Sequence, residues 1–305
     1  MLRFIVQRLF DAIFVILGVS FVVFIMVHLS GDPVLLMLPL DASTEQVQEF
    51  RQRLGFNDPL PVQYARFMWN VAHGDFGTSL RFDQPALRLV TERLPYTIRL
   101  AAVSLTLAAC FGIPTGVIAA VWRGRGWDVA VRVVALLGQA VPIFWLGIML
   151  ILVFGERLHV LPTSGVGSWQ HFVLPSVSLA AYSAASISRL QRSAMLEVLG
   201  QEYVRTAHAK GLPRRVVVTK HALRNALIPV ITIMGLQMGT LLGGAVITET
   251  IFAWPGVGRL SMQAIQSRDY VLVQAAVFIV ATIFVLINLV VDLLYAVLDP
   301  RIHYD

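Results

Sequence analysis

A basic segment around residue 200 carries the side chains of this chain that are best suited to bind a partner. Between positions 189 and 224, eight arginines and lysines stand against two acids. Inside this segment, residues 202–211 have the pattern of a short helix, which ends at Gly211 and is followed by Pro213. Such a helix, with small residues on it and a second basic helix behind it, suits insertion into a groove of another protein. A basic loop can also serve only to orient a membrane chain, so both interpretations stay open.

Motifs for nucleotide hydrolysis or metal catalysis are absent from the sequence. There is no G-x-x-x-x-G-K-[ST] loop, no H-E-x-x-H pair and no Cys/His ligand set, and Cys110 is the single cysteine. Five serines lie between positions 176 and 188, but no base is evident for them, so we expect them to pack helices or to line a polar cavity. We therefore predict a chain that is not an enzyme and binds no cofactor or metal itself.

Composition indicates a membrane protein. Of the 305 residues, 57% are hydrophobic and 14% are charged, and the mean hydropathy is +0.72, whereas globular domains carry about 25% charged residues. These values exclude a disordered chain, an ordinary water-soluble enzyme and a protein whose main partner is nucleic acid. The net charge of +6 requires no acidic ligand, because membrane proteins collect arginine and lysine in their cytoplasmic loops.

Six apolar stretches are long enough to cross a bilayer, which takes about 20 helical residues. They lie at about 9–29, 95–122, 129–154, 172–188, 226–248 and 270–297. The fourth is the shortest and the richest in serine. The first is longer than the apolar part of a signal peptide and lacks a small-residue cleavage site, so we expect an uncleaved helix. Four stretches contain a proline that can bend a helix, namely Pro114, Pro142, Pro175 and Pro229.

Arginine and lysine predict the orientation of these stretches. Both lysines lie in the basic segment, and Arg123 and Arg125 stand in the short turn between the second and third stretches. With both of these loops in the cytoplasm, the two termini are cytoplasmic as well. The predicted divisions are a cytoplasmic start and first span (1–30), an extracytoplasmic segment (31–94), the remaining spans (95–298) and a cytoplasmic tail (299–305). Residues 156–171 and 251–269 then join the extracytoplasmic side.

The extracytoplasmic segment has its own helix signals. A capping box at Ser43 and Gln46 predicts a helix over 45–54, which stops at Gly55. Proline at the start and glycine or proline at the end predict helices over 61–73 and 85–94. This small helical segment is either a lid that packs on the bundle, which the composition favours, or a docking surface for an extracytoplasmic partner.

Small residues mark places where helices approach each other closely. Gly235, Gly239 and Gly243 recur every four residues in the fifth stretch, and Gly112 and Gly116 lie in the second. Such a stripe is first of all a packing face. The alternative is that the fifth span lines a central pathway or a seam between two subunits.

The basic segment resembles the EAA coupling loop of ABC importer permeases. With Gly211 placed on the invariant glycine of that motif, Ala207 falls on its second alanine. Without gaps, Leu223 falls on the closing leucine and Pro229 on a later proline. The EAA-like loop then covers residues 189–225.

Differences from the general motif are similar to those of the dipeptide/oligopeptide branch of these permeases. Its pattern is close to E-D-Y-V-R-T-A-R-A-K-G followed by H-A-L-R-N-A-L-I-P, which accounts for Arg205, Thr206 and Arg224. Two residues depart from the branch pattern, because Gln201 stands before Glu202 and His208 replaces an arginine. The salt bridge of that arginine is therefore not expected here.

Further blocks in the same order resemble the B-type permease of this branch. They are Gly31-Asp32-Pro33, Gly74 to Ser79, Arg93-Leu94-Pro95, Trp254 to Leu260, and Ala264-Ile265 with Arg268-Asp269-Tyr270. The run from Trp169 to Ser176 is most similar to the glutathione-importer version. Together the blocks cover nearly the whole chain.

The resemblance implies an all-α, six-helix polytopic protein with the type I ABC importer permease fold. It implies uptake of dipeptides, oligopeptides or glutathione across the bacterial inner membrane. Nickel-chelate importers share the same blocks, so the blocks do not identify the solute. The implied partners are a second homologous permease, two P-loop ATPases that bind ATP, an extracytoplasmic solute-binding protein and membrane lipid, but no nucleic acid. The ATPase-coupling residues implied by the match are Glu202, Tyr203, Arg205, Thr206, Ala207, His208, Ala209, Lys210 and Gly211.

A self-contained secondary transporter or channel is the alternative from another class. Such proteins often show inverted repeats and charged residues at mid-membrane depth. Neither feature is apparent in this sequence, which favours the importer. Dependence of transport on ATP rather than on an ion gradient would separate the two.

Overall fold

The computed structural model describes residues 2–29, 43–54 and 57–298 of the chain. Apart from one isolated β-bridge between Thr78 and Pro85, all regular elements in these ranges are helices, which confirms the all-α prediction. The predicted features at Gly31–Pro33, at Gly55 and in the 299–305 tail lie outside the described residues.

The chain forms two compact units, each described here by itself. The first comprises Met1–Tyr96 with Pro255–Leu289, and the second comprises Thr97–Trp254 with Val290–Asp305. These units group residues by packing, whereas the divisions predicted from the sequence group them by side of the membrane. The two units therefore do not test the predicted divisions.

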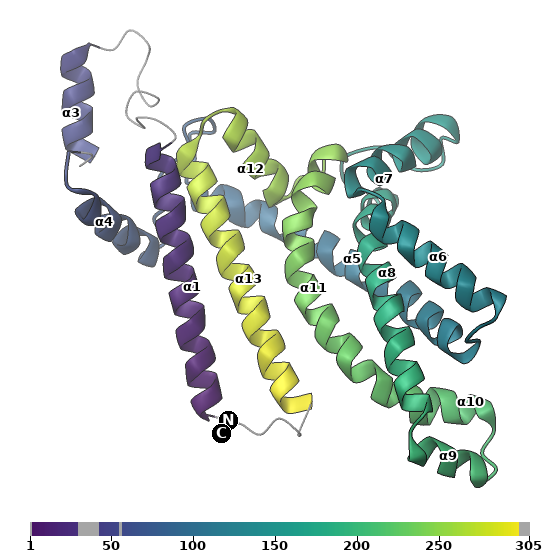
Figure 1. Ribbon diagram of the computed structural model, residues 1–305. Coiled ribbons are helices and arrows are strands. Elements are labelled where there is room, and N and C mark those ends of the chain that lie inside the picture. The colour runs from purple at the N-terminus through teal and green to yellow at the C-terminus, as the bar shows by residue number, and fades with distance from the viewer. Residues whose placement is uncertain (1, 30–42, 55–56, 299–305) are drawn as a thin grey trace. The chain divides into compact units, whose positions relative to one another are not determined.

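The first unit contains the helical segment that follows the first span. Its helices are α1 (Leu2–Leu29), α3 (Thr44–Leu54), α4 (Leu60–Ala72), the start of α5 (Ala86–Val121), α12 (Val257–Gln266) and most of α13 (Tyr270–Leu298) (Figure 1). The predicted capping box is present, since Ser43 N–H donates to Gln46 Oε1 at 2.9 Å and Gln46 N–H donates to Ser43 Oγ at 3.2 Å. The helix predicted over 61–73 is α4.

An aromatic contact joins α4 to the first span. The hydroxyl of Tyr64 lies 2.7 Å from Ser20 Oγ, and its ring packs edge-on against Phe21 and Phe24 with centroids 5.6 and 5.4 Å apart. Tyrosine suits this position because its ring is apolar while its hydroxyl finds a polar partner. Helix α4 therefore packs on the first span.

A small core joins three helices of the first unit. Ala86 and Val90 of α5 pack with Val257 and Ala264 of α12 and with Leu272, Ala275 and Ala276 of α13. Within each helix these buried positions recur three, four or seven residues apart, which places them on one face. The start of α5, α12 and the start of α13 are therefore held together.

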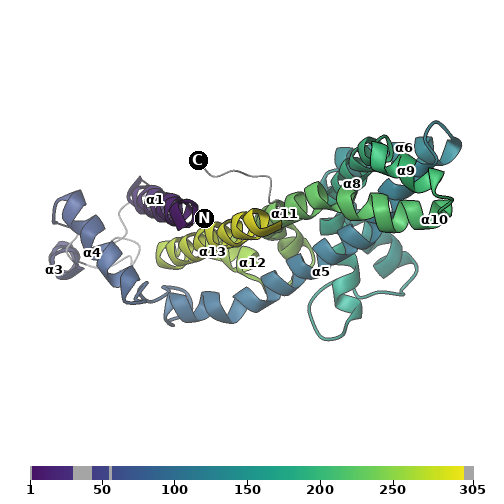
Figure 2. The same ribbon diagram turned by 90° about the horizontal axis from the view of Figure 1, so that it is seen from below.

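The prediction that a helix ends before Pro95 was wrong, because α5 continues without a break to Val121 (Figure 2). Proline inside a helix removes one backbone hydrogen bond and costs about 3 kcal/mol. In α5, buried residues stand on both sides of the proline, with Ala86 and Val90 before it and Leu100 and Ala101 after it. Packing on both sides outweighs the local cost.

The second unit is built around α8. Its helices are the remainder of α5, α6 (Gly126–Ala140), α7 (Ile143–Leu150), π-helical η1 (Ile151–Arg157), α8 (Gln170–Leu199), α9 (Glu202–Ala209), α10 (Arg214–Val216), π-helical η2 (Val217–Ala222) and α11 (Leu223–Ile251). In Figure 1, α8 lies between α6 and α11, and both helices contact it. Glycine allows α5 to approach α8 closely: a Cβ on Gly116 would lie 2.5 Å from the Ser188 carbonyl oxygen.

The third span, expected as one helix over 129–154, is broken. The pair formed by α6 and α7 with η1 bends by 101° at Val141 and Pro142, both of which have extended backbone. Proline has no N–H with which to continue the helix. The hydroxyl of Ser178 donates to the Ile143 carbonyl at 3.1 Å, which joins α8 to the start of α7 just after the break.

Length and apolarity support fewer independent spans than the six expected. Among the described residues, four helices qualify by themselves, at Ile5–Met26, Ala86–Val121, Arg214–Ile251 and Tyr270–Leu293, and the bent pair makes a fifth. The expected fourth span is α8, which is long but carries many serines and a basic end. Its serines are largely buried by protein, including Ser176, Ser178 and Ser183. The count of six spans therefore stays a prediction.

The close contact at Gly116 predicts a large effect of one added methyl group. Gly116→Ala forces α5 and α8 apart, and overpacking of this kind costs about 1–3 kcal/mol. We expect a drop of several degrees in the melting temperature of the purified subunit. The matched control is Gly243→Ala, because a Cβ there meets no described atom within 4 Å and alanine favours the helix. Equal melting temperatures of the two variants would contradict the close α5–α8 contact.

Candidate functional site

The candidate site is the loop that joins α8 to α11, and α9 is its exposed helix. As predicted, a short helix follows Glu202 and ends at glycine. Gly211 has φ +77°, its N–H donates to the His208 carbonyl at 2.9 Å, and Leu212 N–H donates to the Ala207 carbonyl at 3.3 Å. These two bonds form a Schellman motif, which needs a left-handed residue at its glycine position. Figure 1 shows α9 and α10 at the end of α8 and α11.

The inner face of α9 packs on the rest of the loop. Val204 and Ala207 are buried against Val217 of η2, and the cluster is completed by Val198, Leu199 and Leu212. This arrangement makes α9 part of a packed unit that includes the end of α8 and the start of η2. Ala207 therefore faces the loop's own core, and a larger side chain there would first disturb that core.

The outer face of α9 is exposed and mostly polar. The exposed residues are Glu202, Tyr203, Arg205, Thr206, His208, Ala209 and Lys210. Arg205 donates to Glu202 at 2.9 Å, but both side chains are largely exposed, so this pair adds little stability. A partner that binds this loop would meet these side chains rather than Ala207.

Tyr203 connects α9 directly to α11. Its hydroxyl accepts a hydrogen bond of 2.7 Å from Asn225 Nδ2, and the same amide donates to the His221 carbonyl at 3.3 Å. The role of Asn225 was missed from the sequence, although the residue lies within the motif pattern quoted for the loop. A movement of α9 can thus reach the first turn of α11 through a side-chain contact as well as through the chain.

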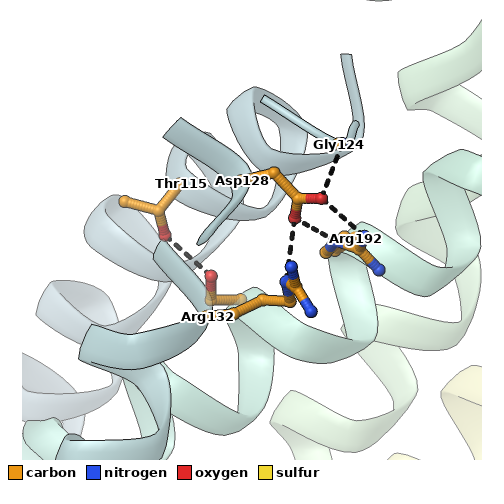
Figure 3. A network of polar contacts seen from close by, with 6 residues as sticks. Thr115, Gly124, Asp128, Arg132 and Arg192 are labelled. Carbon is orange, nitrogen blue, oxygen red and sulfur yellow. Dashed lines mark hydrogen bonds and ion pairs between the residues drawn. The ribbon is translucent and has the colours of Figure 1, made fainter. Parts of the chain in front are cut away.

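A buried carboxylate anchors the helices beneath the loop (Figure 3). Asp128 of α6 accepts two bonds from Arg192 of α8, at 2.7 Å from Nε and 3.0 Å from Nη2, and a third of 3.0 Å from the Gly124 N–H. Arg132 adds an ion pair at 3.3 Å. Bidentate arginine–carboxylate pairs are among the stronger polar contacts in proteins. The α5–α6 turn, α6 and α8 are therefore held together where the loop begins.

Two further bonds extend this anchor. Thr115 of α5 donates to Ser188 Oγ at 3.0 Å, and Arg214 of α10 donates to the Val121 carbonyl at 3.0 Å. Sequence reasoning missed the anchor and treated the basic residues mainly as an orientation signal. The available signal was Asp128, the single acid in a basic turn, which needs a cationic partner when buried.

The glycine stripe of α11 splits into different environments. A Cβ on Gly235 would lie 2.6 Å from Val291 Cγ1, Gly239 is buried, and a Cβ on Gly243 would meet no described atom within 4 Å. Gly235 is thus required for close packing within the second unit. Gly243 leaves open space, so its position stays compatible with the pathway or subunit-seam alternative.

Removal of the buried charge of Asp128 should lower the stability of the subunit far more than removal of the exposed charge of Glu202. Asp128→Asn leaves Arg192 without its anionic partner, which we expect to cost about 2–4 kcal/mol, below the range for fully buried pairs because the Arg192 side chain is 23% exposed. Glu202→Gln, which breaks the exposed Arg205 pair, should change little. Melting temperatures of the two purified variants test this difference, and equal losses would show that the Asp128 pair is no anchor.

Comparison with known proteins agrees with this architecture. A model of the family "Binding-protein-dependent transport system inner membrane component" matches residues 112–304, and a model of the N-terminal part of such components matches residues 1–101. The glutathione transport system permease protein GsiC of Escherichia coli K12 is 43% identical over 305 residues, and that of Salmonella paratyphi A is 44% identical. In both cases all of this chain and all of the relative are covered.

Solved structures of an ABC importer share the fold. The chain is similar to two inward-facing crystal forms of the MetNI methionine ABC transporter, with TM-scores of 0.55 and 0.57 at 20% identity. The similarity covers 70% and 69% of this chain and 97% and 96% of the matched chains. At this identity the likeness concerns the fold alone. The two family models and the full-length relatives decide the family: this chain belongs to the binding-protein-dependent transport system inner membrane components and is a permease subunit of an ABC importer.

Proposed function

We propose that α9 is the element through which ATPase subunits drive this permease. One observation carries the proposal: the inner face of α9 is packed on η2 by Val204 and Ala207, while its outer face is exposed. A helix held in this way moves as one body with the start of α11. ATP binding closes the ATPase pair, the pair displaces α9, and α11 follows through η2 and the Tyr203–Asn225 bond.

The proposed partners are the other subunits of a binding-protein-dependent importer. A second homologous permease completes the pathway, two P-loop ATPases bind and hydrolyse ATP, and a solute-binding protein delivers the solute from the extracytoplasmic side. This chain itself carries out no hydrolysis and binds no ATP. Residues 189–225 and both termini then lie in the cytoplasm, since cytoplasmic loops are rich in arginine and lysine. Residues 31–94 and 251–269 lie on the opposite side.

Glutathione is the proposed solute. Relatives named as glutathione transport permeases are 43% and 44% identical over the full length of this chain, which supports a related, peptide-like solute. Dipeptides and oligopeptides are the alternatives from the same branch. Competition decides among them: unlabelled glutathione should abolish uptake of labelled glutathione by the reconstituted importer, whereas stronger inhibition by a dipeptide would assign the solute to dipeptides.

The left-handed turn at the end of α9 provides the test of coupling. A Cβ on Gly211 meets no described atom, so any effect of substitution comes from its φ of +77°. A side chain other than glycine or asparagine costs about 1–2 kcal/mol in this conformation, and a β-branched one costs most. We expect Gly211→Val to lower ATP-driven uptake about tenfold, because the strained turn moves α9, while the amount of subunit in the membrane is unchanged.

Gly211→Asn is the matched control, since asparagine tolerates the left-handed region. It should keep most of the uptake. Uptake of Gly211→Val at the level of the native protein would refute the coupling role of α9. A similar loss in Gly211→Val and Gly211→Asn would show that something other than the turn conformation matters at this position.

A further inference from the structure

An apolar groove runs along the second unit between α5, α6 and α8. Its volume is about 440 Å³, which lies within the roughly 300–1,000 Å³ that is typical of small-molecule sites. On α6 its lining extends from Trp127 to Gly138, a distance of about 16 Å at 1.5 Å per residue. We call this cavity the α6 groove. It is separate from the coupling helix α9, none of whose residues lines it.

The interior of the α6 groove offers hydrocarbon rather than hydrogen-bond partners. None of its described lining residues is charged, and most are apolar. The two hydroxyls in the lining, those of Thr115 and Ser188, bond to each other at 3.0 Å. Phe111 and Val134 line the groove and are 65% and 67% exposed, so the groove is open on its outer side. Such a surface is favourable in contact with lipid chains and unfavourable in contact with water.

The end of the α6 groove at Trp127 carries positive charge. Trp127 lies at the start of α6, directly after the α5–α6 turn with its exposed residues Arg123 and Arg125. The acid of this region, Asp128, is already bound by two other arginines, one of α6 and one of α8 (Figure 3). It therefore does not neutralise the turn, and an anion at this end of the groove meets an excess of positive charge.

Tryptophans place this end of the groove at the level of the lipid headgroups. Trp122 and Trp127 are both exposed, and the guanidinium of Arg125 lies 5.8 Å from the ring centroid of Trp122. Tryptophan is enriched at the membrane–water interface, and basic side chains there contact lipid phosphates. The groove then continues into the bilayer for about 16 Å, which is close to half of the hydrocarbon core of about 30 Å.

The width of the α6 groove favours a hydrocarbon chain over a helix of another subunit. A volume of about 440 Å³ over a length of about 16 Å gives a mean cross-section of about 28 Å². A helix with its side chains is about 10 Å across, so its cross-section is about 80 Å². A single extended chain is narrow enough to enter, and its many weak dispersion contacts with the walls add up to stable binding.

We propose that the α6 groove binds an acyl chain of an anionic phospholipid, whose phosphate is held by Arg123 and Arg125. The proposed orientation places this lipid in the cytoplasmic leaflet, but its binding depends neither on the solute nor on the coupling role of α9. The lipid lies where α5, α6 and α8 meet, next to the Asp128–Arg192 pair at the base of the loop. Its binding therefore stabilises the helices on which the loop is built.

The test measures lipid binding to the complete importer after its own lipid has been removed with detergent. Phosphatidylglycerol and phosphatidylcholine with brominated acyl chains are titrated, because bromine quenches tryptophan fluorescence only at short range. The difference between the native importer and a Trp127→Phe variant isolates the signal of Trp127. We expect saturable quenching of Trp127 by phosphatidylglycerol, with an apparent Kd at least tenfold below that for phosphatidylcholine.

Arg123→Gln combined with Arg125→Gln tests the headgroup contact. The apparent Kd for phosphatidylglycerol should rise about thirtyfold, which corresponds to about 1 kcal/mol for each arginine near an anionic headgroup. The matched control is Arg215→Gln combined with Lys220→Gln, which removes the same charge from exposed positions of α10 and η2. This control should change the Kd less than twofold.

Ala130→Phe tests the binding of the chain without any change of charge. Ala130 lines the α6 groove and is itself exposed, so a phenylalanine there fills the groove instead of entering a helix contact. The apparent Kd for phosphatidylglycerol should rise at least tenfold. Val133→Phe is the matched control, because Val133 is an exposed residue of the same helix that does not line the groove.

Three results would overturn the proposal. The first is equal affinity of the native importer for the two lipids. The second is unchanged binding of phosphatidylglycerol in the arginine pair variant or in Ala130→Phe. The third is a complete importer in which brominated lipid does not quench Trp127, because another subunit would then cover the groove.

Discussion

The proposed drive through α9 depends on one constraint: α9 is packed against the helices that follow it. Burial of Val204 and Ala207 against Val217 turns an eight-residue helix, too short to be stable alone in water, into a fixed part of the second unit. The Schellman turn at Gly211 ends the helix at a defined place, and Tyr203 ties its outer edge to Asn225. The charged side chains of the outer face can then vary without loss of the contacts that connect α9 to α11, whereas Tyr203 is part of those contacts.

Transmission of a movement of α9 to the spans also requires that the base of the loop is rigid. The Asp128–Arg192 pair and the Arg214 bond to the Val121 carbonyl join the α5–α6 turn, α8 and α10 at the root of the loop. Close contact of α5 with α8 at Gly116 continues this connection into the spans. A displacement of α9 is therefore passed on to whole helices instead of being lost in a flexible loop.

Local signals allowed much of the structure to be predicted from the sequence. The capping box at Ser43, the helix end at Gly211 and four of the six long apolar stretches each depend on neighbouring residues alone, and the structure agrees with them. The continuation of α5 through Pro95 depends on packing between segments far apart in sequence, so no local pattern reveals it. Asp128 stands out locally as the single acid in a basic turn, but its partner Arg192 is far away in sequence and no local pattern identifies it. Pro142 was recognised as a possible bend, but its size of 101° could not be predicted locally, since α7 also contacts α8 and α11, which lie far away in sequence.

Cross-linking from the outer face of α9 tests the central claim most directly. A cysteine is introduced as His208→Cys in a Cys110→Ser background, and the complete importer is labelled in its native membrane with a short thiol reagent that carries a photoactivatable group, which needs no cysteine on the partner. We predict a cross-link to a P-loop ATPase subunit, with a yield that changes on ATP binding, and none from Trp169→Cys, an exposed position on the loop before α8. An importer that transports normally while His208→Cys forms no cross-link to an ATPase would contradict the account.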